Sequence, residues 1–232
     1  MPRPFLRACA LLLVSALLCH CRAPQPSPPP SPAALRLWHR ANSRLAAATF
    51  LDRAGHPIPW RFSLRDTSGV NAQSWPDGRI QLTFGALSFA QNEAELAAVT
   101  AHEMAHIAAR HGRAQTFDSA ATLLASAALA TLLSQSSDPT TASAAATAAL
   151  FSVSLTALTA RQREREFAAD LASLDLLRRA HYPPSAAVHF WQRYAAARAL
   201  QGLGKPHWWL PHPPDAERLR RLRLAASPSP AP

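Results

Sequence analysis

The residues best suited to chemistry in this sequence are His102, Glu103 and His106, which form an H-E-x-x-H pattern. Two histidines four positions apart lie about 40° apart around an α-helix, so both rings can bind one metal ion. The glutamate lies beside that ion and can act as a general base. The pattern predicts a zinc site that activates water. The alternative is two solvated helix histidines, since the pattern arises by chance in roughly one of a hundred such chains.

A helix over Glu93–Gly112 is expected to hold these residues. Leu96, Val99 and Ile107 recur at helical spacing and predict its buried face, and Gly112 is a plausible C-terminal stop. On such a helix His111 lies about 180° from His102, which excludes it as a third ligand.

The third ligand must therefore come from another segment of the chain. The metzincin pattern fails, because Ala109 and Gly112 stand where it needs Gly and His. All three cysteines lie within the first 21 residues, so no thiolate site is available in the remainder. Any zinc ion must be bound by histidines and carboxylates.

A charged stretch that begins at Arg161 offers the missing carboxylate. Glu166 and Asp170 share one helix face, whereas Glu164 points about 200° away from Glu166. Two histidines and a glutamate with an open fourth position are the arrangement of catalytic zinc sites. Spacing alone leaves an alternative, in which Glu166 is an exposed residue among arginines.

The segments before the central helix predict a small sheet. The pattern of Ala34–Leu51 predicts an amphipathic helix. Apolar and polar residues alternate in Trp60–Leu64 and in Arg79–Phe84, which predicts two strands. We expect an α+β fold, mostly α-helical, with a small antiparallel sheet beside the H-E-x-x-H helix.

The N-terminal residues 1–23 have the pattern of an export signal, with two arginines before an apolar core at Ala8–Leu18. A cleaved signal peptide and a lipoprotein signal, with Cys19 or Cys21 as the lipidated residue, both stay open. Residues 24–33 form a proline-rich tether. We expect an exported, periplasmic protein that is anchored to a membrane.

The remaining chain is long enough for one domain, over residues 34–224, followed by a disordered tail at 225–232. The net charge of +10 raises the question of nucleic acid, but no recognition motif is present, so we expect no nucleic-acid partner. A basic surface that favours anionic membranes is the simpler interpretation.

Residues 119–160 form an Ala-rich insert between the expected ligands, with Asp138 as its one charged residue. Its length permits two membrane spans, but alanine, serine and threonine dominate, and leucines are few. We expect a helical hairpin that packs on the domain and can dip into a membrane, with two membrane spans as the alternative.

At this point the sequence resembles the gluzincin metallopeptidase family that includes the HtpX-type, Ste-type and Oma-type proteases and the periplasmic BepA-like enzymes. The resemblance extends over about residues 35–224. The matching segments are Asn71-Ala72, Gly78-Arg79-Ile80, Gly85-Ala86-Leu87, Glu95 through His106, Arg110-His111-Gly112, Arg165 through Asp170, His181-Tyr182-Pro183-Pro184, Phe190-Trp191-Gln192-Arg193 and Pro211 through Leu219.

The resemblance implies a zincin-like domain that binds one Zn²⁺ per subunit. Its motifs place the metal on His102, His106 and Glu166, with Glu103 as the general base. The substrate would lie extended along an edge strand, which we assign to the residues Arg79, Ile80, Gln81 and Leu82.

Two further residues have expected roles beside the metal. We expect Asp170 to orient a ligand histidine, with a purely structural role on the helix face as the alternative. His212 either stabilises the oxyanion or occupies the open metal position as a latch, and the alternative is a histidine packed between loop prolines.

The implied function is that of a zinc metalloendopeptidase that cleaves unfolded or misassembled proteins in cell-envelope quality control. The alternative is a non-catalytic, chaperone-like binding module in which zinc is structural. Glu103 favours the enzyme, because a structural zinc site needs no general base.

Overall fold

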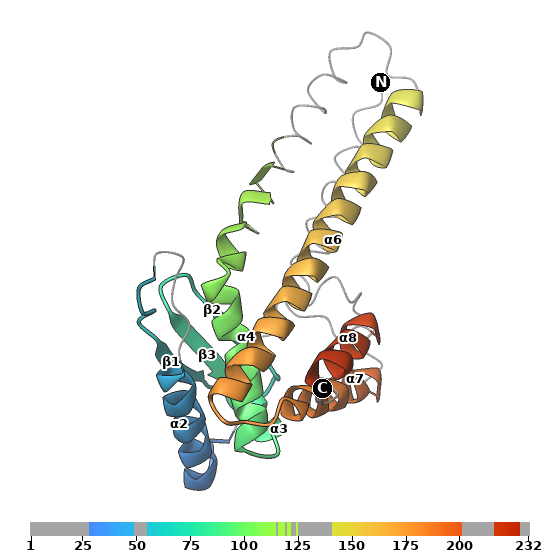
Figure 1. The fold of residues 1–232 in the computed structure, drawn as a ribbon. Helices are drawn as coiled ribbons and strands as arrows, with labels where there is room; N and C mark the ends of the chain where they lie inside the picture. Colours follow the sequence, from blue (N-terminus) through green and yellow to red (C-terminus); the bar gives the residue numbers. More distant parts are fainter. Residues whose placement is uncertain are drawn as a thin grey trace.

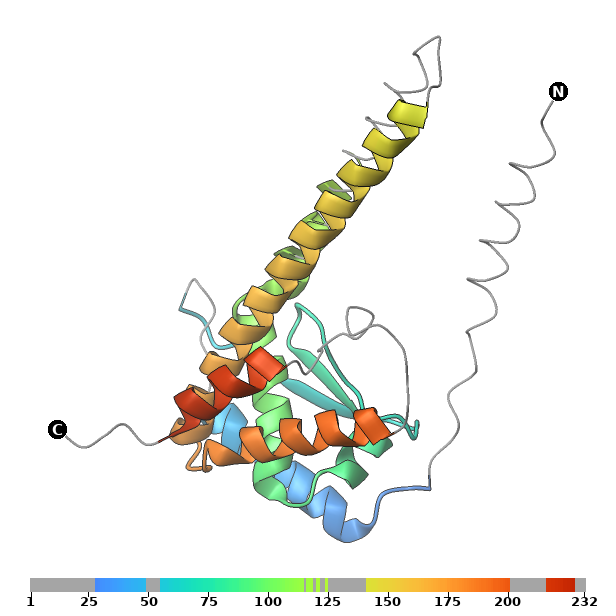
Figure 2. The same cartoon turned by 90° about the vertical axis from the view of Figure 1, so that its right-hand side faces the viewer.

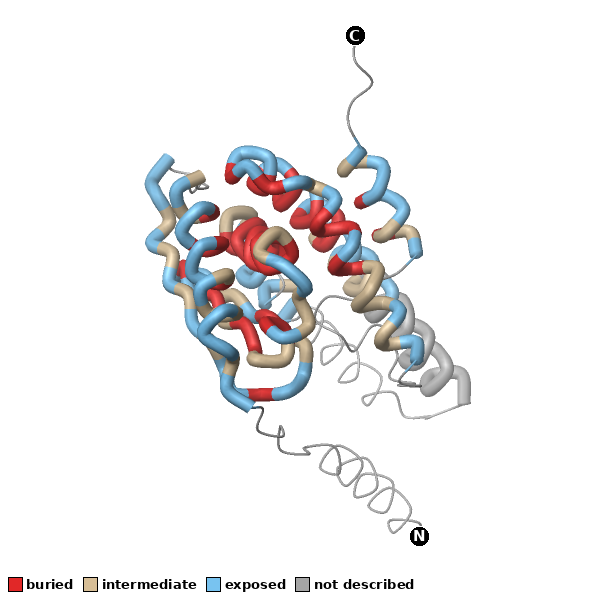
Figure 3. The backbone as a smooth tube through the Cα atoms, turned by 90° about the horizontal axis from the view of Figure 1, so that it is seen from below, coloured by how far each residue is buried: buried red, intermediate tan, exposed pale blue. Residues whose placement is uncertain are grey.

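The helix with the H-E-x-x-H residues, α4 (Glu93–Ala108), is the central element of the fold. It packs against helices α2, α6 and α7 and against strands β2 and β3. Twelve of its sixteen residues are buried. The computed structural model describes residues 28–48, 55–114, 116–118, 120–121, 124, 141–200 and 216–227. Figure 1 shows α4 between the sheet and α6, and Figure 3 shows the buried helix surrounded by the other elements.

Local sequence signals start and end the flanking helices. The first described helix, α2 (Pro32–Ala47), begins with the Ser31 hydroxyl accepting a hydrogen bond from the Ala34 N–H, and proline occupies its first turn. Helix α4 begins with the Asn92 side chain, which accepts from the Glu95 N–H. Both helices lie close to their expected positions, but α4 ends at Ala108, four residues before Gly112.

The sheet has three strands in the order β1-β3-β2, namely β1 (Arg61–Arg65), β2 (Ala72–Ser74) and β3 (Arg79–Thr83). Strands β2 and β3 are antiparallel, whereas β1 and β3 are parallel. The expectation of a wholly antiparallel sheet is therefore wrong. The chain reverses direction twice, after β1 and after β2, and β1 and β2 flank β3 on opposite sides, so β1 runs parallel to β3.

The third ligand segment lies within α6 (Thr141–Arg179), a continuous helix of 39 residues. Figures 1 and 2 show its first half extending away from the domain, so this part of the insert is helical but does not pack on the domain as expected. Residues 119, 122–123 and 125–140 of the insert lie outside the described residues. None of the helices in the described ranges is long and apolar enough to cross a bilayer.

Three further helices with defined bounds lie in the described part of the chain, in addition to the helical residues 111–114, 116–118, 120–121 and 124. Helix α3 (Phe84–Phe89) follows β3 directly, and α7 (Ser185–Leu200) packs on α4. Helix α8 (Ala216–Ala226) packs on α6 and α7 and ends two residues beyond the expected domain boundary. The core lies where these helices meet α4 and includes Met104, Leu174 and Phe190, each at most 2% exposed.

The loop between β1 and β2 crosses the start of α3 at very short range. A Cβ at Gly85 would lie 2.1 Å from the Ser68 carbonyl oxygen and 2.6 Å from that of Gly69. The Thr83 hydroxyl fixes the same crossing, because it donates to the Gly69 carbonyl at 2.6 Å and accepts from the Ala86 N–H at 3.1 Å.

We therefore expect Gly85→Ala to lower the free energy of unfolding by about 2 kcal/mol, because the methyl group must displace backbone atoms. Urea unfolding measures the effect. Gly69→Ala is the matched control, since a Cβ at Gly69 meets no atom within 4 Å. Equal stability of the two variants would contradict the close crossing.

Candidate metal centre

Three side chains from two helices converge on one point and can hold a metal ion: His102, His106 and Glu166. The two Nε2 atoms lie 3.0 Å apart. The Glu166 carboxylate oxygens lie 3.3 Å from His102 Nε2 and 3.4 Å from His106 Nε2. Two imidazole nitrogens and one carboxylate oxygen on one side of a point leave the other side open, which is the donor set of catalytic zinc sites.

The two helices position these ligands in different ways. Helix α4 provides both histidines from successive turns, whereas α6 provides Glu166 from its buried face. Glu166 is 3% exposed and Glu164 is exposed, so the helical spacing correctly distinguished the two carboxylates.

Asp170 lies one turn after Glu166 and contacts the first histidine. Its Oδ1 is 3.0 Å from His102 Nδ1, the ring nitrogen that faces away from the other ligands. A carboxylate at this nitrogen fixes the orientation and tautomer of the ring and leaves Nε2 available for a metal. The contact that an orienting role requires is present, and the role of Asp170 itself stays a prediction.

Arg218 on α8 is the site residue that the sequence analysis missed. Its guanidinium donates to both oxygens of Asp170, at 2.7 and 2.8 Å, and lies 3.1 Å from Glu166 Oε2. It is 2% exposed and stacks on the Trp191 ring at 4.3 Å. Arg218 and the buried Leu222 lie one turn apart on one face of α8, and an arginine on an apolar helix face indicates a buried acidic partner.

These contacts set the charge of the metal-free site. Burial raises the pKa of Asp170, but attraction to Arg218 and hydrogen bonds from Arg218 and His102 outweigh burial and lower it overall. Burial lowers the pKa of His102, but hydrogen bonds to Asp170 and Glu166 outweigh it and raise the pKa above the usual range. A metal ion must displace the proton that these carboxylates favour.

His111 contacts the site although it is outside the metal-binding group. Because α4 ends at Ala108, the chain turns before His111, and the angle calculated for a helix through Gly112 does not apply. His111 Nδ1 lies 3.0 Å from His106 Nδ1 and therefore holds the second ligand ring from behind. Burial, followed by the charges of His106 and Arg165, lowers the pKa of His111 to about 4.

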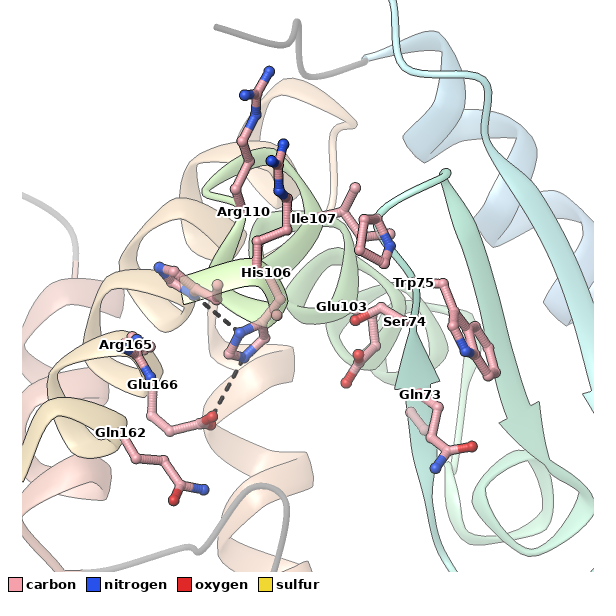
Figure 4. A pocket seen from close by; sticks show the side chains of 15 residues that line it. Gln73, Ser74, Trp75, Glu103, His106, Ile107, Arg110, Gln162, Arg165 and Glu166 are labelled. Carbon is pink, nitrogen blue, oxygen red and sulfur yellow. Dashed lines mark hydrogen bonds and ion pairs between the residues drawn. The ribbon is translucent and has the colours of Figure 1, made fainter. Parts of the chain in front are cut away.

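Glu103 faces a cavity of about 240 Å³ that also exposes His106 and Glu166. Figure 4 shows its carboxylate between the ligands on one side and Ser74 and Gln73 of β2 on the other. Glu103 is 2% exposed and is not part of the metal-binding group. This position, beside the ligands and open to the cavity, suits a general base.

A second, smaller cavity of about 30 Å³ shares Glu103 and Ala72 with the first. Its walls are mostly apolar and are formed by Val70, Asn71, Ala72, Ala86, Val99, Phe190, Trp191 and Tyr194. The two cavities differ in the side chains that surround the same carboxylate, because most residues that line the first are polar or charged and most that line the second are apolar.

The strand expected to bind substrate is not an edge strand. Residues Arg79–Thr83 form β3, which pairs with β1 on one side and with β2 on the other. Ile80 and Leu82 are each 1% exposed in the core. The assignment of Arg79, Ile80, Gln81 and Leu82 as an edge that receives substrate is therefore wrong, because no backbone groups of β3 are left for a further strand. The edge strand that lines the large cavity is β2.

His212 lies outside the described residues, so its expected role as an oxyanion contact or latch remains a prediction.

A comparison with known protein families finds that residues 37–226 match the family described as Peptidase family M48. The match includes α4, α6 and α8, the helices that bring the ligands, Asp170 and Arg218 together.

We expect Arg218→Met to destabilise the metal-free protein by about 3 kcal/mol, because two buried carboxylates lose their cation. Arg218→Lys should lose less stability than Arg218→Met, since lysine keeps the positive charge but cannot form the paired hydrogen bonds of the guanidinium. Urea unfolding in the presence of a chelator measures both. Arg220→Met is the control, because Arg220 pairs with Glu217 at the surface. An Arg218→Met protein as stable as the control would contradict the buried charge cluster.

Proposed function

The chain belongs to peptidase family M48, and from this and the site we propose that it is a zinc-dependent metalloendopeptidase. The observation that supports the proposal most is the position of Glu103 in the same cavity as the ligands His106 and Glu166. A general base beside an open metal position is what hydrolysis of a peptide bond requires, and a structural zinc site has no use for it.

The residues of the chain divide the reaction between them. His102, His106 and Glu166 would hold the Zn²⁺ ion, which supplies Lewis acidity for the water and for the peptide carbonyl. Glu103 takes a proton from the attacking water and returns it to the amine that leaves. Asp170 and His111 keep the two histidine rings in orientation, since each contacts the Nδ1 atom of one ligand, at 3.0 Å in both cases.

The edge of β2 supports binding of an extended polypeptide. The Asn71 carbonyl accepts from the Thr83 N–H of β3, and the Trp75 N–H donates to the Arg79 carbonyl, so the backbone groups of the alternate residues Ala72 and Ser74 face the open side. The Ala72 N–H is already bonded to the Asn71 side chain at 2.9 Å. The Ser74 N–H and carbonyl remain oriented to pair with a substrate strand, which would be recognised by its backbone.

We extend the proposal to the place and the substrates of the enzyme. The signal-like N-terminus supports export to the cell envelope, with attachment to a membrane through a lipid or the N-terminal segment. Recognition through the backbone suits unfolded or misassembled proteins, because folded proteins rarely present a free extended segment. We therefore propose a role in protein quality control of the envelope.

We expect Glu103→Gln to lower the rate of casein hydrolysis by about 10²- to 10⁴-fold, because the general base is lost. The zinc content of the variant should equal that of the unaltered protein, since the ligands are unchanged. Metal analysis and a casein assay on both proteins test this. Equal activity of the two proteins, or no zinc in either, would contradict the proposed enzyme.

Ser74→Pro tests the edge strand separately from the chemistry. Proline removes the outward N–H, and an edge position tolerates it, so we expect kcat/KM for a peptide substrate to fall about five- to tenfold. Ser74→Ala keeps the backbone N–H, so its kcat/KM should fall much less. If the alanine variant lost as much activity as the proline variant, the side chain and not the backbone would be responsible.

A further inference from the structure

Two arginines lie at the mouth of the large cavity, and we call Arg110 and Arg113 the arginine rim. Both line the same cavity as Glu103 and β2, and both are exposed. Neither forms an ion pair with another residue in the described part of the chain. Arg165 also lines the cavity, but it is paired with Asp118. The arginine rim is thus the part of the cavity with positive charge left over for a ligand.

The acidic groups near the rim do not offset this charge. Glu166 is buried and lies 3.1 Å from Arg218 Nη1. Glu103 is buried at the reaction centre, and Asp118 pairs with Arg161 and Arg165. His111, between the two rim residues, adds no negative charge. A ligand that enters the cavity therefore meets unpaired cations at the mouth.

The backbone of Arg110 is a second, independent observation. Its φ of 57° is left-handed, and its N–H donates to the Ile107 carbonyl to close the end of α4. Glycine favours this position after a helix, because any side chain there is strained. The chain has a long cationic side chain at a position where glycine would adopt the backbone conformation with less strain. Such strain beside a cavity indicates a functional constraint.

We propose that the arginine rim binds acidic side chains of the polypeptide substrate, so that the enzyme prefers segments with Asp or Glu near the cleaved bond. This inference rests on the proposed peptidase function. Figure 4 shows the Arg110 side chain directed away from Glu103, so the contact is with substrate residues a few positions from the reacting carbonyl. Guanidinium and carboxylate groups form paired hydrogen bonds, and such remote contacts raise kcat/KM.

The position of the rim favours a polypeptide over a lipid surface. Arg110 and Arg113 share their cavity with the edge of β2 and with the reaction centre, so a chain that pairs with Ser74 would enter the cavity that both arginines line. A flat array of anionic headgroups would have to reach the same arginines from outside. The test must therefore distinguish binding of a membrane from binding of a polypeptide substrate.

The test uses two pools of internally quenched peptides with randomised central residues, flanked on both sides by either Glu or Gln. We expect the Glu pool to be cleaved with a kcat/KM about tenfold higher at low salt, and the advantage to shrink at about 0.5 M salt. Arg110→Gly should reduce the preference at least threefold without loss of thermal stability, because glycine relieves the backbone. Arg110→Lys should retain it, and Arg36→Gln, which removes a charge from α2, is the control.

Equal cleavage of both pools by the unaltered protein, or an equal loss on both pools in Arg110→Gly, would overturn the proposal. Failure of the peptidase function is distinguishable, because Glu103→Gln protein can be tested for binding of uncleaved peptides by fluorescence anisotropy. Tighter binding of the Glu pool that Arg110→Gly abolishes supports the rim, and equal binding of both pools refutes it. If Arg110→Gly instead releases the protein from phosphatidylglycerol vesicles and leaves the peptide preference intact, the rim is a membrane contact.

Discussion

The burial of two carboxylates one turn apart is the constraint on which the rest of the site depends. Glu166 and Asp170 are each 3% exposed, and like charges at this spacing repel each other when water is excluded. The Arg218 guanidinium offsets this repulsion because it pairs with both carboxylates, and Trp191 packs against the guanidinium. The position of α8 and the face that α7 presents are therefore part of the metal site, although neither helix provides a ligand.

Close approach of the helices is the second requirement, and the composition of α4 provides it. Ala97, Ala98, Ala101 and Ala105 are each at most 1% exposed, and their small side chains allow neighbouring elements to come near. The carboxylate of Glu166 can then reach both histidines across the interface between α4 and α6. The same packing places the three buried polar residues His102, Glu103 and Glu166 in surroundings where electrostatic interactions are strong.

Residue spacing along single helices predicted the greater part of this site. The separation of His102 from His106, and of Glu166 from Asp170, is a local property of a helix, so it could be read from the sequence, as could the exclusion of Glu164. Assigning Glu166 to the metal also required the resemblance to a family. The mostly helical fold and the elements α2, β1 and β3 were predictable from apolar periodicity and turn residues.

The predictions that were wrong concern features that depend on contacts between distant segments or on an unusual backbone conformation. Strand β2 has three residues and too little alternation to be recognised, so β3 was taken for an edge. The end of α4 was misplaced because Arg110 adopts a conformation that normally indicates glycine. Arg218 lies 48 residues after Asp170 and becomes part of the site only through the packing of α8 on α6. No local pattern gives such a pairing, although a buried arginine on an apolar face signals that some acid must meet it.

The position of Arg218 in chain order has a consequence for the biosynthesis of the protein. Synthesis delivers His102 and His106 first, then Glu166 and Asp170, and only afterwards the helix with the balancing guanidinium. A nascent chain that has reached the third ligand still faces the cost of burying two uncompensated carboxylates, so the interface between α4 and α6 is disfavoured at that stage. Completion of the candidate metal centre is thereby linked to completion of the domain, which restrains the site from forming on a partly made chain.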